Sequence, residues 1–184
     1  LDYGVTVDAV LSAKGGTHSV QLGGMNGTSV SGFFFSTLAQ NPAASIEFRQ
    51  EGANIIFRGS DVKNAAEGVM YDFGFIPLAE HEEQMRSALS DGESTFYYSF
   101  LGHGELPGVA TFSITTGFAE STQVNVYKFD AATNGFTLIA GNLVVSAGGV
   151  VTYKNNTMSE YLITTNTIDG AQVSDMANRQ GVEK

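Results

Sequence analysis

Apolar and polar residues alternate along most of the chain, and a period of two residues is typical of β-strands. The clearest case is a hairpin: Ile46 and Phe48 alternate with polar neighbours, a turn follows at Glu51-Gly52, and the chain returns over Ile55–Arg58. Further strands are predicted at Val5–Leu11, Ser19–Leu22, Val69–Ile76, Phe96–Leu101, Val109–Ile114, Val124–Phe129, Phe136–Ile139, Leu143–Val145, Val150–Tyr153 and Tyr161–Thr164.

Two short stretches have helical spacing instead. Ser31 precedes an apolar run from Phe33 to Leu38 that stops at Asn41-Pro42, which predicts a serine-capped helix of about two turns. A second helix is predicted to begin at Pro77, a residue favoured in a first helical turn, and to end at Asp91-Gly92. Its first turns carry several acidic side chains, which the helix dipole favours at that end.

Strands that recur about every 8–12 residues, with turn residues between them, predict a mainly β fold. We expect an antiparallel β-sandwich-like domain with two short helices, and no parallel doubly wound sheet, because no βαβ alternation is evident. Residues 1–28 are expected to be an N-terminal hairpin or appendage, 29–168 the β-rich core module, and 169–184 a polar tail or linker.

Composition narrows the functional classes. The 184 residues include 9 Lys+Arg and 19 Asp+Glu, a net charge of −10. Nucleic acid is therefore not an expected partner, because polyanions dock on basic surfaces. No apolar run approaches the roughly 20 residues of a membrane-spanning helix, so no membrane insertion of this segment is expected. Only 15% of residues are charged and 22 are Gly. This composition is common in secreted β-rich modules, and it predicts an extracellular or cell-surface location.

The sequence offers no catalytic pattern. Cysteine is absent, which excludes disulfides, thiolate catalysis and Cys-ligated zinc. His81, Glu82 and Glu83 are adjacent, and adjacent positions on a helix do not face one another as metal ligands must. No nucleophile elbow or phosphate-binding loop is present. We therefore expect no enzyme, no catalytic residue, no metal and no cofactor; a hydrolase would need two carboxylates facing each other across a cleft.

Two groups of residues are candidates for ligand binding. Tyr97 and Tyr98 lie in the aromatic run 96–100, and an exposed tyrosine ring can stack on a sugar. The glycine-rich segment 102–108 is expected to form a loop that either arches over a ligand, with His103 and Glu105 as its polar contacts, or is simply a long hairpin turn.

Three stretches, in this order, resemble a known kind of module. They are Ser29–Pro42 with Ala44–Phe48, then Ala53–Val62, then Val124–Leu138 followed by Met158–Ile163. Together they resemble a β-rich repeat module of surface and scaffold-type proteins of Gram-positive anaerobes, which often carry dockerin-like, anchor or glycan-binding segments. The chain departs from that pattern in having no Trp. The resemblance implies a non-catalytic extracellular module.

Three functional classes are considered for the chain, in order of preference. The first is a structural spacer or a protein-interaction or adhesion module whose partners are other surface or scaffold proteins. The alternative is a carbohydrate-binding module whose partner is a polysaccharide, favoured by exposed coplanar tyrosines. The third is a hydrolase.

Overall fold

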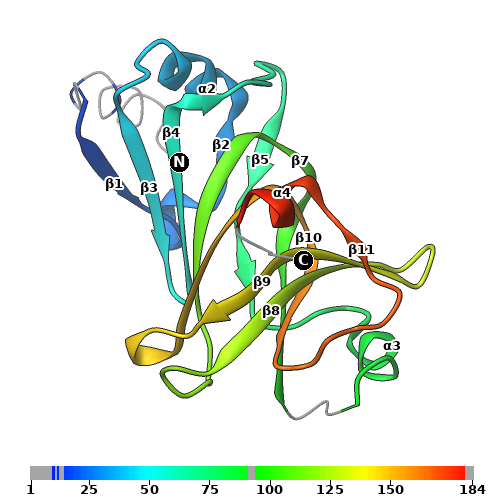
Figure 1. The fold of residues 1–184 in the computed structure, drawn as a ribbon. Helices are drawn as coiled ribbons and strands as arrows, with labels where there is room; N and C mark the ends of the chain where they lie inside the picture. Colours follow the sequence, from blue (N-terminus) through cyan, green and yellow to red (C-terminus); the bar gives the residue numbers. More distant parts are fainter. Residues whose placement is uncertain (1–9, 11, 13–14, 91–93, 181–184) are drawn as a thin grey trace. The chain divides into compact units, whose positions relative to one another are not determined.

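A computed structural model describes residues 10, 12, 15–90 and 94–180, and it is mainly β, as the sequence predicts (Figure 1). Its strands are β1 (Thr17–Gln21), β2 (Ser29–Ser31), β3 (Ser45–Gln50), β4 (Ala53–Val62), β5 (Met70–Asp72), β6 (Phe75–Ile76), β7 (Thr95–Thr115), β8 (Gln123–Asp130), β9 (Gly135–Val144), β10 (Val150–Thr164) and β11 (Gln172–Val173). The α-helices are α2 (Gly32–Ala39), α3 (Glu82–Arg86) and α4 (Asp175–Arg179), and short 3-10 turns cover Gly24–Asn26 and Ala147–Gly149. Of the strand expected over Val5–Leu11, only Val10 lies among the described residues, and it is buried with helical rather than extended backbone.

The chain divides into two compact units. Unit 1 contains the described residues up to Phe75 together with 100–112 and 156–158, and unit 2 contains 76–99, 113–155 and the described residues from 159 onward. The long strands β7 and β10 contribute to both units. Each unit combines segments that are far apart in the sequence.

In unit 1 the strands follow the order β1, β3, β4, β7, and β2 and β5 form a separate antiparallel ribbon. The β3–β4 hairpin forms where predicted, with Gly52 in its turn at φ 86°. β1 pairs in parallel with β3, so the sheet is mixed at this edge rather than antiparallel throughout. The reason is connectivity: the segment between them includes α2, and such a crossover returns the chain to the same end of the sheet. Residues 17–21 are thus a strand of this sheet.

Helix α2 supplies the core of unit 1. Its predicted cap is confirmed, because the Ser31 side chain accepts a hydrogen bond from the Phe33 amide at 3.2 Å. Phe34, Phe35 and Leu38 are fully buried beside β4. The Phe35 ring lies at the centre of an aromatic cluster, with ring centroids 4.8–6.2 Å from those of Phe34, Phe48, Phe57, Tyr71 and Phe73.

The cap gives a first prediction. Ser31→Ala removes the acceptor of the Phe33 amide and is expected to lower the free energy of unfolding by about 1 kcal/mol. Urea denaturation measures the change. Ser36→Ala, inside the same helix, is the control and is expected to change stability by no more than a few tenths of a kcal/mol, because alanine is a better helix former. Equal losses in the two variants would contradict the capping role.

Unit 2 is built on β10, β8, β9 and β11, in that order. β8 and β9 form the predicted hairpin, and Asp130 acts as a turn residue: its carboxylate accepts a hydrogen bond from the Ala132 amide at 3.0 Å. β11 pairs in parallel with β9, a second departure from an antiparallel sheet. Where a polar tail was expected, α4 follows, capped by Ser174 and holding Met176 and Ala177 in buried positions. The segment is mostly polar in sequence, and its two buried residues, Met176 and Ala177, are too few to produce a recognisable apolar pattern.

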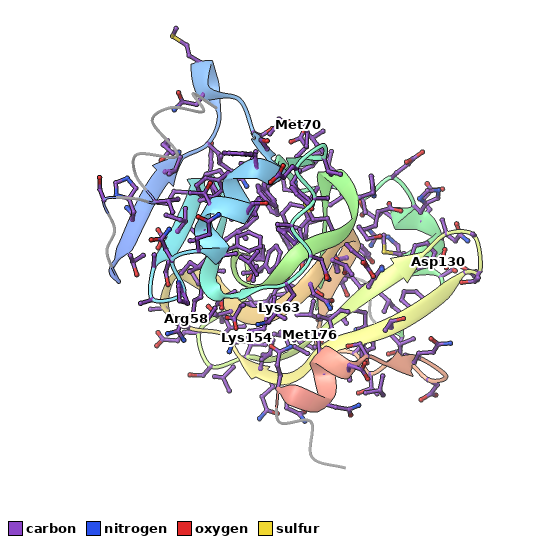
Figure 2. The ribbon with its side chains drawn as sticks, turned by 90° about the horizontal axis from the view of Figure 1, so that it is seen from above. Arg58, Lys63, Met70, Asp130, Lys154 and Met176 are labelled. Carbon is purple, nitrogen blue, oxygen red and sulfur yellow. The ribbon has the colours of Figure 1, made fainter. Side chains whose placement is uncertain are left out.

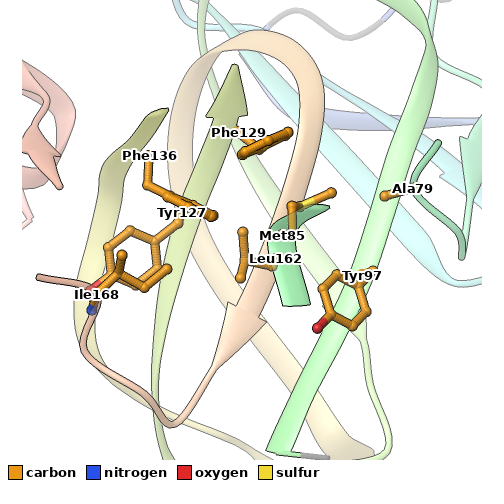
Figure 3. Close-up of a cluster of buried hydrophobic side chains, with 8 residues drawn as sticks. All are labelled: Ala79, Met85, Tyr97, Tyr127, Phe129, Phe136, Leu162 and Ile168. Carbon is orange, nitrogen blue, oxygen red and sulfur yellow. Dashed lines mark hydrogen bonds between the residues drawn. The ribbon is translucent and has the colours of Figure 1, made fainter. Parts of the chain in front are cut away.

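Side chains from six parts of unit 2 form its hydrophobic cluster (Figure 3). Its buried members are Ala79, Met85, Tyr97, Tyr127, Phe129, Phe136, Leu162 and Ile168. Ala79 and Met85 come from the segment of α3, and the others come from β7, β8, β9, β10 and the chain after β10. The cluster therefore fastens the α3 segment to the sheet of this unit.

The second helix is shorter than predicted. It begins at Glu82 rather than at Pro77, and the described part of the chain has three α-helices rather than two. Partners outside the helix explain the late start: the Leu78 carbonyl accepts a hydrogen bond from the Ser99 hydroxyl at 2.8 Å, and the His81 amide donates to Glu160 at 2.9 Å. In the described ranges, no helix is both long enough and apolar enough to cross a membrane.

Candidate functional site on the outer face of the β2–β5 ribbon

The two tyrosines expected to stack on a ligand are buried. Tyr97 is 7% exposed, and the Arg86 guanidinium lies over its ring, 5.3 Å from the centroid. Burial raises the pKa of the Tyr97 hydroxyl, and the charge of Arg86 partly opposes that rise. Tyr98 is fully buried. Neither ring presents a face to solvent, so neither has the exposure that stacking on a sugar requires.

Tyr98 belongs to a hydrogen-bonded group inside unit 2. Its hydroxyl bonds to that of Tyr153, its ring stacks on Tyr161 with centroids 5.4 Å apart, and the Tyr161 hydroxyl accepts from the Asn155 amide at 3.0 Å. Burial raises the pKa values of Tyr98 and Tyr153 well above the ordinary range, so both stay protonated at neutral pH. Tyr127 is buried as well. These tyrosines stabilise the core.

His103 and Glu105 are exposed, but they do not lie in a loop. β7 runs without interruption through the glycine-rich segment, and the Pro107 carbonyl accepts hydrogen bonds from the amides of Lys63 and Asn64, both at 2.9 Å. Gly104 has φ 105°, a conformation that favours glycine and that lets the strand continue with a local irregularity. The segment was expected to be a loop because glycine and proline normally interrupt strands.

The β2–β5 ribbon has one buried and one exposed face. Its register pairs Val30 with Tyr71, and both side chains are buried against the aromatic core. Because side chains alternate along a strand, Ser31 and its partner Met70 lie on the opposite face, as does Asp72. Met70 is 62% exposed and stands at the edge of the side chains in Figure 2.

Exposed apolar side chains extend this face in both directions. At one end, the Gly32 amide donates a hydrogen bond of 2.7 Å to the Val69 carbonyl. This bond holds Val69 next to the start of α2, where Phe33 follows Gly32. At the other end, the side chains of Leu101 and Thr28 both approach the bare Cα of Gly74, and Thr28 donates to Asp72 at 2.6 Å. We call Phe33, Val69, Met70 and Leu101 the outer strip; they are 44, 43, 62 and 55% exposed.

Carboxylates border the outer strip. Asp72 lies between Met70 and Leu101, with one oxygen held by Thr28 and by the Gly74 amide at 3.0 Å. Glu67 is exposed in the turn that leads to Val69, and Glu105 is exposed on β7 beyond Leu101. Contiguous exposed apolar residues with a polar rim are typical of interaction surfaces, and Met and Phe are among the residues enriched there. Sequence reasoning missed the strip because its members come from three segments that are far apart in the sequence.

A second arrangement was also missed: a histidine–carboxylate pair in unit 2. Glu160 is 8% exposed, and its two oxygens accept the His81 amide at 2.9 Å and contact His81 Nδ1 at 2.7 Å. His81, the residue before α3, therefore has a carboxylate partner on a distant strand. A signal existed in the sequence, since Glu160 shares a strand face with Leu162, and a carboxylate at an apolar position needs a partner.

The described residues contain no group of three or more side chains suited to hold a metal ion. Comparison with known proteins finds no matching family model, no similar curated protein and no similar solved structure.

Proposed function

We propose that the chain is a non-catalytic extracellular module of a bacterial surface protein, and that unit 1 binds a protein partner through the outer strip. The observation that carries the proposal is the exposure of four large apolar side chains on or beside the exposed face of the β2–β5 ribbon, in a unit that otherwise buries most of its aromatic rings in a core. Burying such a strip against a partner removes apolar area from water, which is the main driving force of protein association.

Charge indicates the chemistry of the partner. Three carboxylates, from Glu67, Asp72 and Glu105, border the strip, and the chain carries a net charge of −10. A partner with an apolar centre and a rim of Lys or Arg complements this surface, whereas two copies of the chain repel each other. We therefore assign the strip to a basic-rimmed protein surface rather than to self-association.

The other two functional classes have less support. A sugar platform needs an accessible aromatic face, and Tyr97, Tyr98, Tyr127 and Tyr153 are all buried. Retaining or inverting glycoside cleavage needs two carboxylates across a cleft, and among the described residues the buried carboxylate is Glu160, which pairs with His81.

Binding of designed peptides to the immobilised protein tests the proposal. The probes are three peptides of equal length: a Leu/Phe centre with Lys/Arg flanks, the same centre with Asp/Glu flanks, and a Ser/Gly centre with Lys/Arg flanks. We expect biolayer interferometry to detect the first peptide alone, with affinity that falls as salt is added. Met70→Asp is expected to weaken this binding about tenfold or more, because it places a charge in the buried centre of the contact.

The control variant is Val173→Asp. Val173 is 53% exposed, but it lies on β11 in unit 2, so its substitution is expected to leave binding unchanged. Equal loss in both variants, equal binding of all three peptides, or no binding would overturn the assignment of the strip. Concentration-dependent dimerisation in sedimentation, lost in Met70→Asp, would identify a second copy as the occupant and contradict the charge argument.

A further inference from the structure

We propose that the segment Ile76–Ser90 of unit 2 is a pH-dependent latch, which His81 and Glu160 hold closed over the hydrophobic cluster below neutral pH and which opens more often as the pH rises. This inference concerns unit 2 and is independent of the outer strip.

The geometry places one buried carboxylate at the entrance of the segment. Glu160, on β10, is 8% exposed and engages both the backbone amide and the ring Nδ1 of His81, at 2.9 and 2.7 Å. His81 is the residue that precedes α3, so this bidentate contact fixes where the helix begins. A helix of five residues is too short to be stable alone and depends on such attachments.

The segment covers apolar side chains. Ala79 and Met85 are buried in the cluster, Leu89 packs against it, and beneath them lie residues of the sheet such as Phe129 and Leu162 (Figure 3). When the segment moves away, this apolar surface meets water. The free-energy cost of exposing this apolar surface keeps the latch closed most of the time. The contact between His81 and Glu160 shifts the equilibrium between closed and open latch further toward the closed state when His81 is protonated.

The charged groups around His81 favour its protonated form. Glu160 faces it from β10, and Glu80 acts on it from its own segment. From β8, the uncharged Phe129 ring packs 6.3 Å from the imidazole, while Lys128 and Asp130 lie on the other face of that strand. On α3, Glu82 is paired with Arg86, and Glu83 is exposed.

The hydrogen bond to Glu160 is the main reason that the pKa of His81 is raised above its usual range; burial opposes it, and the charges of Glu160 and Glu80 add to it. Because the folded value exceeds the unfolded value of about 6.5, the added stability is fully present below that pH. It is lost as the pH rises through the folded pKa. The latch is therefore tightest in mildly acidic medium.

Hydrogen bonds that do not involve the His81 ring keep the segment attached when that ring is neutral. The Ser99 hydroxyl donates to the Leu78 carbonyl at 2.8 Å, and Gln84 donates to Asn134 at 2.9 Å. None of these groups titrates near neutral pH. Opening is thus expected to be local to 76–90, without global unfolding.

Hydrogen exchange of the whole chain at pH 5.5 and pH 8.0 tests the latch, with labelling times scaled to the intrinsic exchange rate at each pH. We expect protection of the amides of residues 82–89 to be about three- to tenfold lower at pH 8.0, while β3 and β4 are unchanged. His81→Gln is expected to abolish this pH dependence, and His103→Gln, an exposed histidine of unit 1, is expected to retain it.

An NMR titration of the His81 ring provides a second measurement in which no element needs to open. Its midpoint is expected above about 6.5 and is expected to fall in Glu160→Gln, which keeps an oxygen acceptor but removes the charge. Equal protection of 82–89 at both pH values in the wild type would overturn the proposal. So would a pH response that persists in His81→Gln, or a midpoint unaffected by Glu160→Gln.

Discussion

Gly32→Ala is expected to lower the free energy of unfolding by about 3 kcal/mol. A Cβ atom at this position lies 1.7 Å from the Ala66 carbonyl oxygen and 2.7 Å from its carbon, and both are backbone atoms. No side chain can turn aside to make room, so the turn before β5 must move. That movement breaks the 2.7 Å hydrogen bond from the Gly32 amide to the Val69 carbonyl.

Gly68→Ala is the matched control for this steric argument. Gly68 lies in the same turn, but nothing is within 4 Å of the position of its Cβ atom, and a change below about 0.5 kcal/mol is expected. Urea denaturation of both variants measures the difference. If Gly32→Ala is as stable as Gly68→Ala, the clash between a Cβ atom at position 32 and the Ala66 backbone does not destabilise the protein, and the steric argument is wrong. Because the same turn positions Val69, Gly32→Ala is also expected to weaken peptide binding to the outer strip.

Phe35→Ala is expected to have the largest effect on stability, a loss of about 3–5 kcal/mol. Its ring is fully buried and contacts five other aromatic rings, so truncation leaves a cavity that the two sheets of unit 1 cannot easily fill. Guanidinium denaturation, followed by far-UV circular dichroism, measures the loss.

Phe33→Ala separates packing from binding. Phe33 lies on the same helix but is 44% exposed, so its removal is expected to cost at most about 1 kcal/mol of stability. The same variant is expected to weaken binding of the Lys/Arg-flanked peptide severalfold. If Phe33→Ala destabilises the protein as much as Phe35→Ala, the division of α2 into a core face and a binding face is incorrect.

Local patterns predicted the local elements well. The serine cap of α2 and the β3–β4 hairpin depend on residues close together in the sequence, and both form as expected. The parallel pairing of β1 with β3 was not predictable in this way, because it depends on where a crossover helix returns the chain. The uninterrupted course of β7 through Pro107 similarly depends on tertiary partners.

The candidate sites were less accessible to sequence reasoning. Tyr97 and Tyr98 have the composition of a sugar platform, but alternation alone does not say whether both faces of a strand are covered, and here they are. His81 and Glu160 lie 79 positions apart, and no spacing rule connects them. Leu101 is far from Met70 in the sequence, and it lies beside the chain that follows β5 because the bare backbone of Gly74 leaves room for its side chain.

The most direct test of the outer strip as a docking face is a binding footprint. Amide chemical shifts of the labelled protein are recorded while the peptide with a Leu/Phe centre and Lys/Arg flanks is added. The account predicts perturbations confined to residues 28–33, 67–74 and 101–105, with little change in β8, β9 and β11. A footprint centred on unit 2, or no perturbation at peptide concentrations that saturate the interferometry signal, would contradict it.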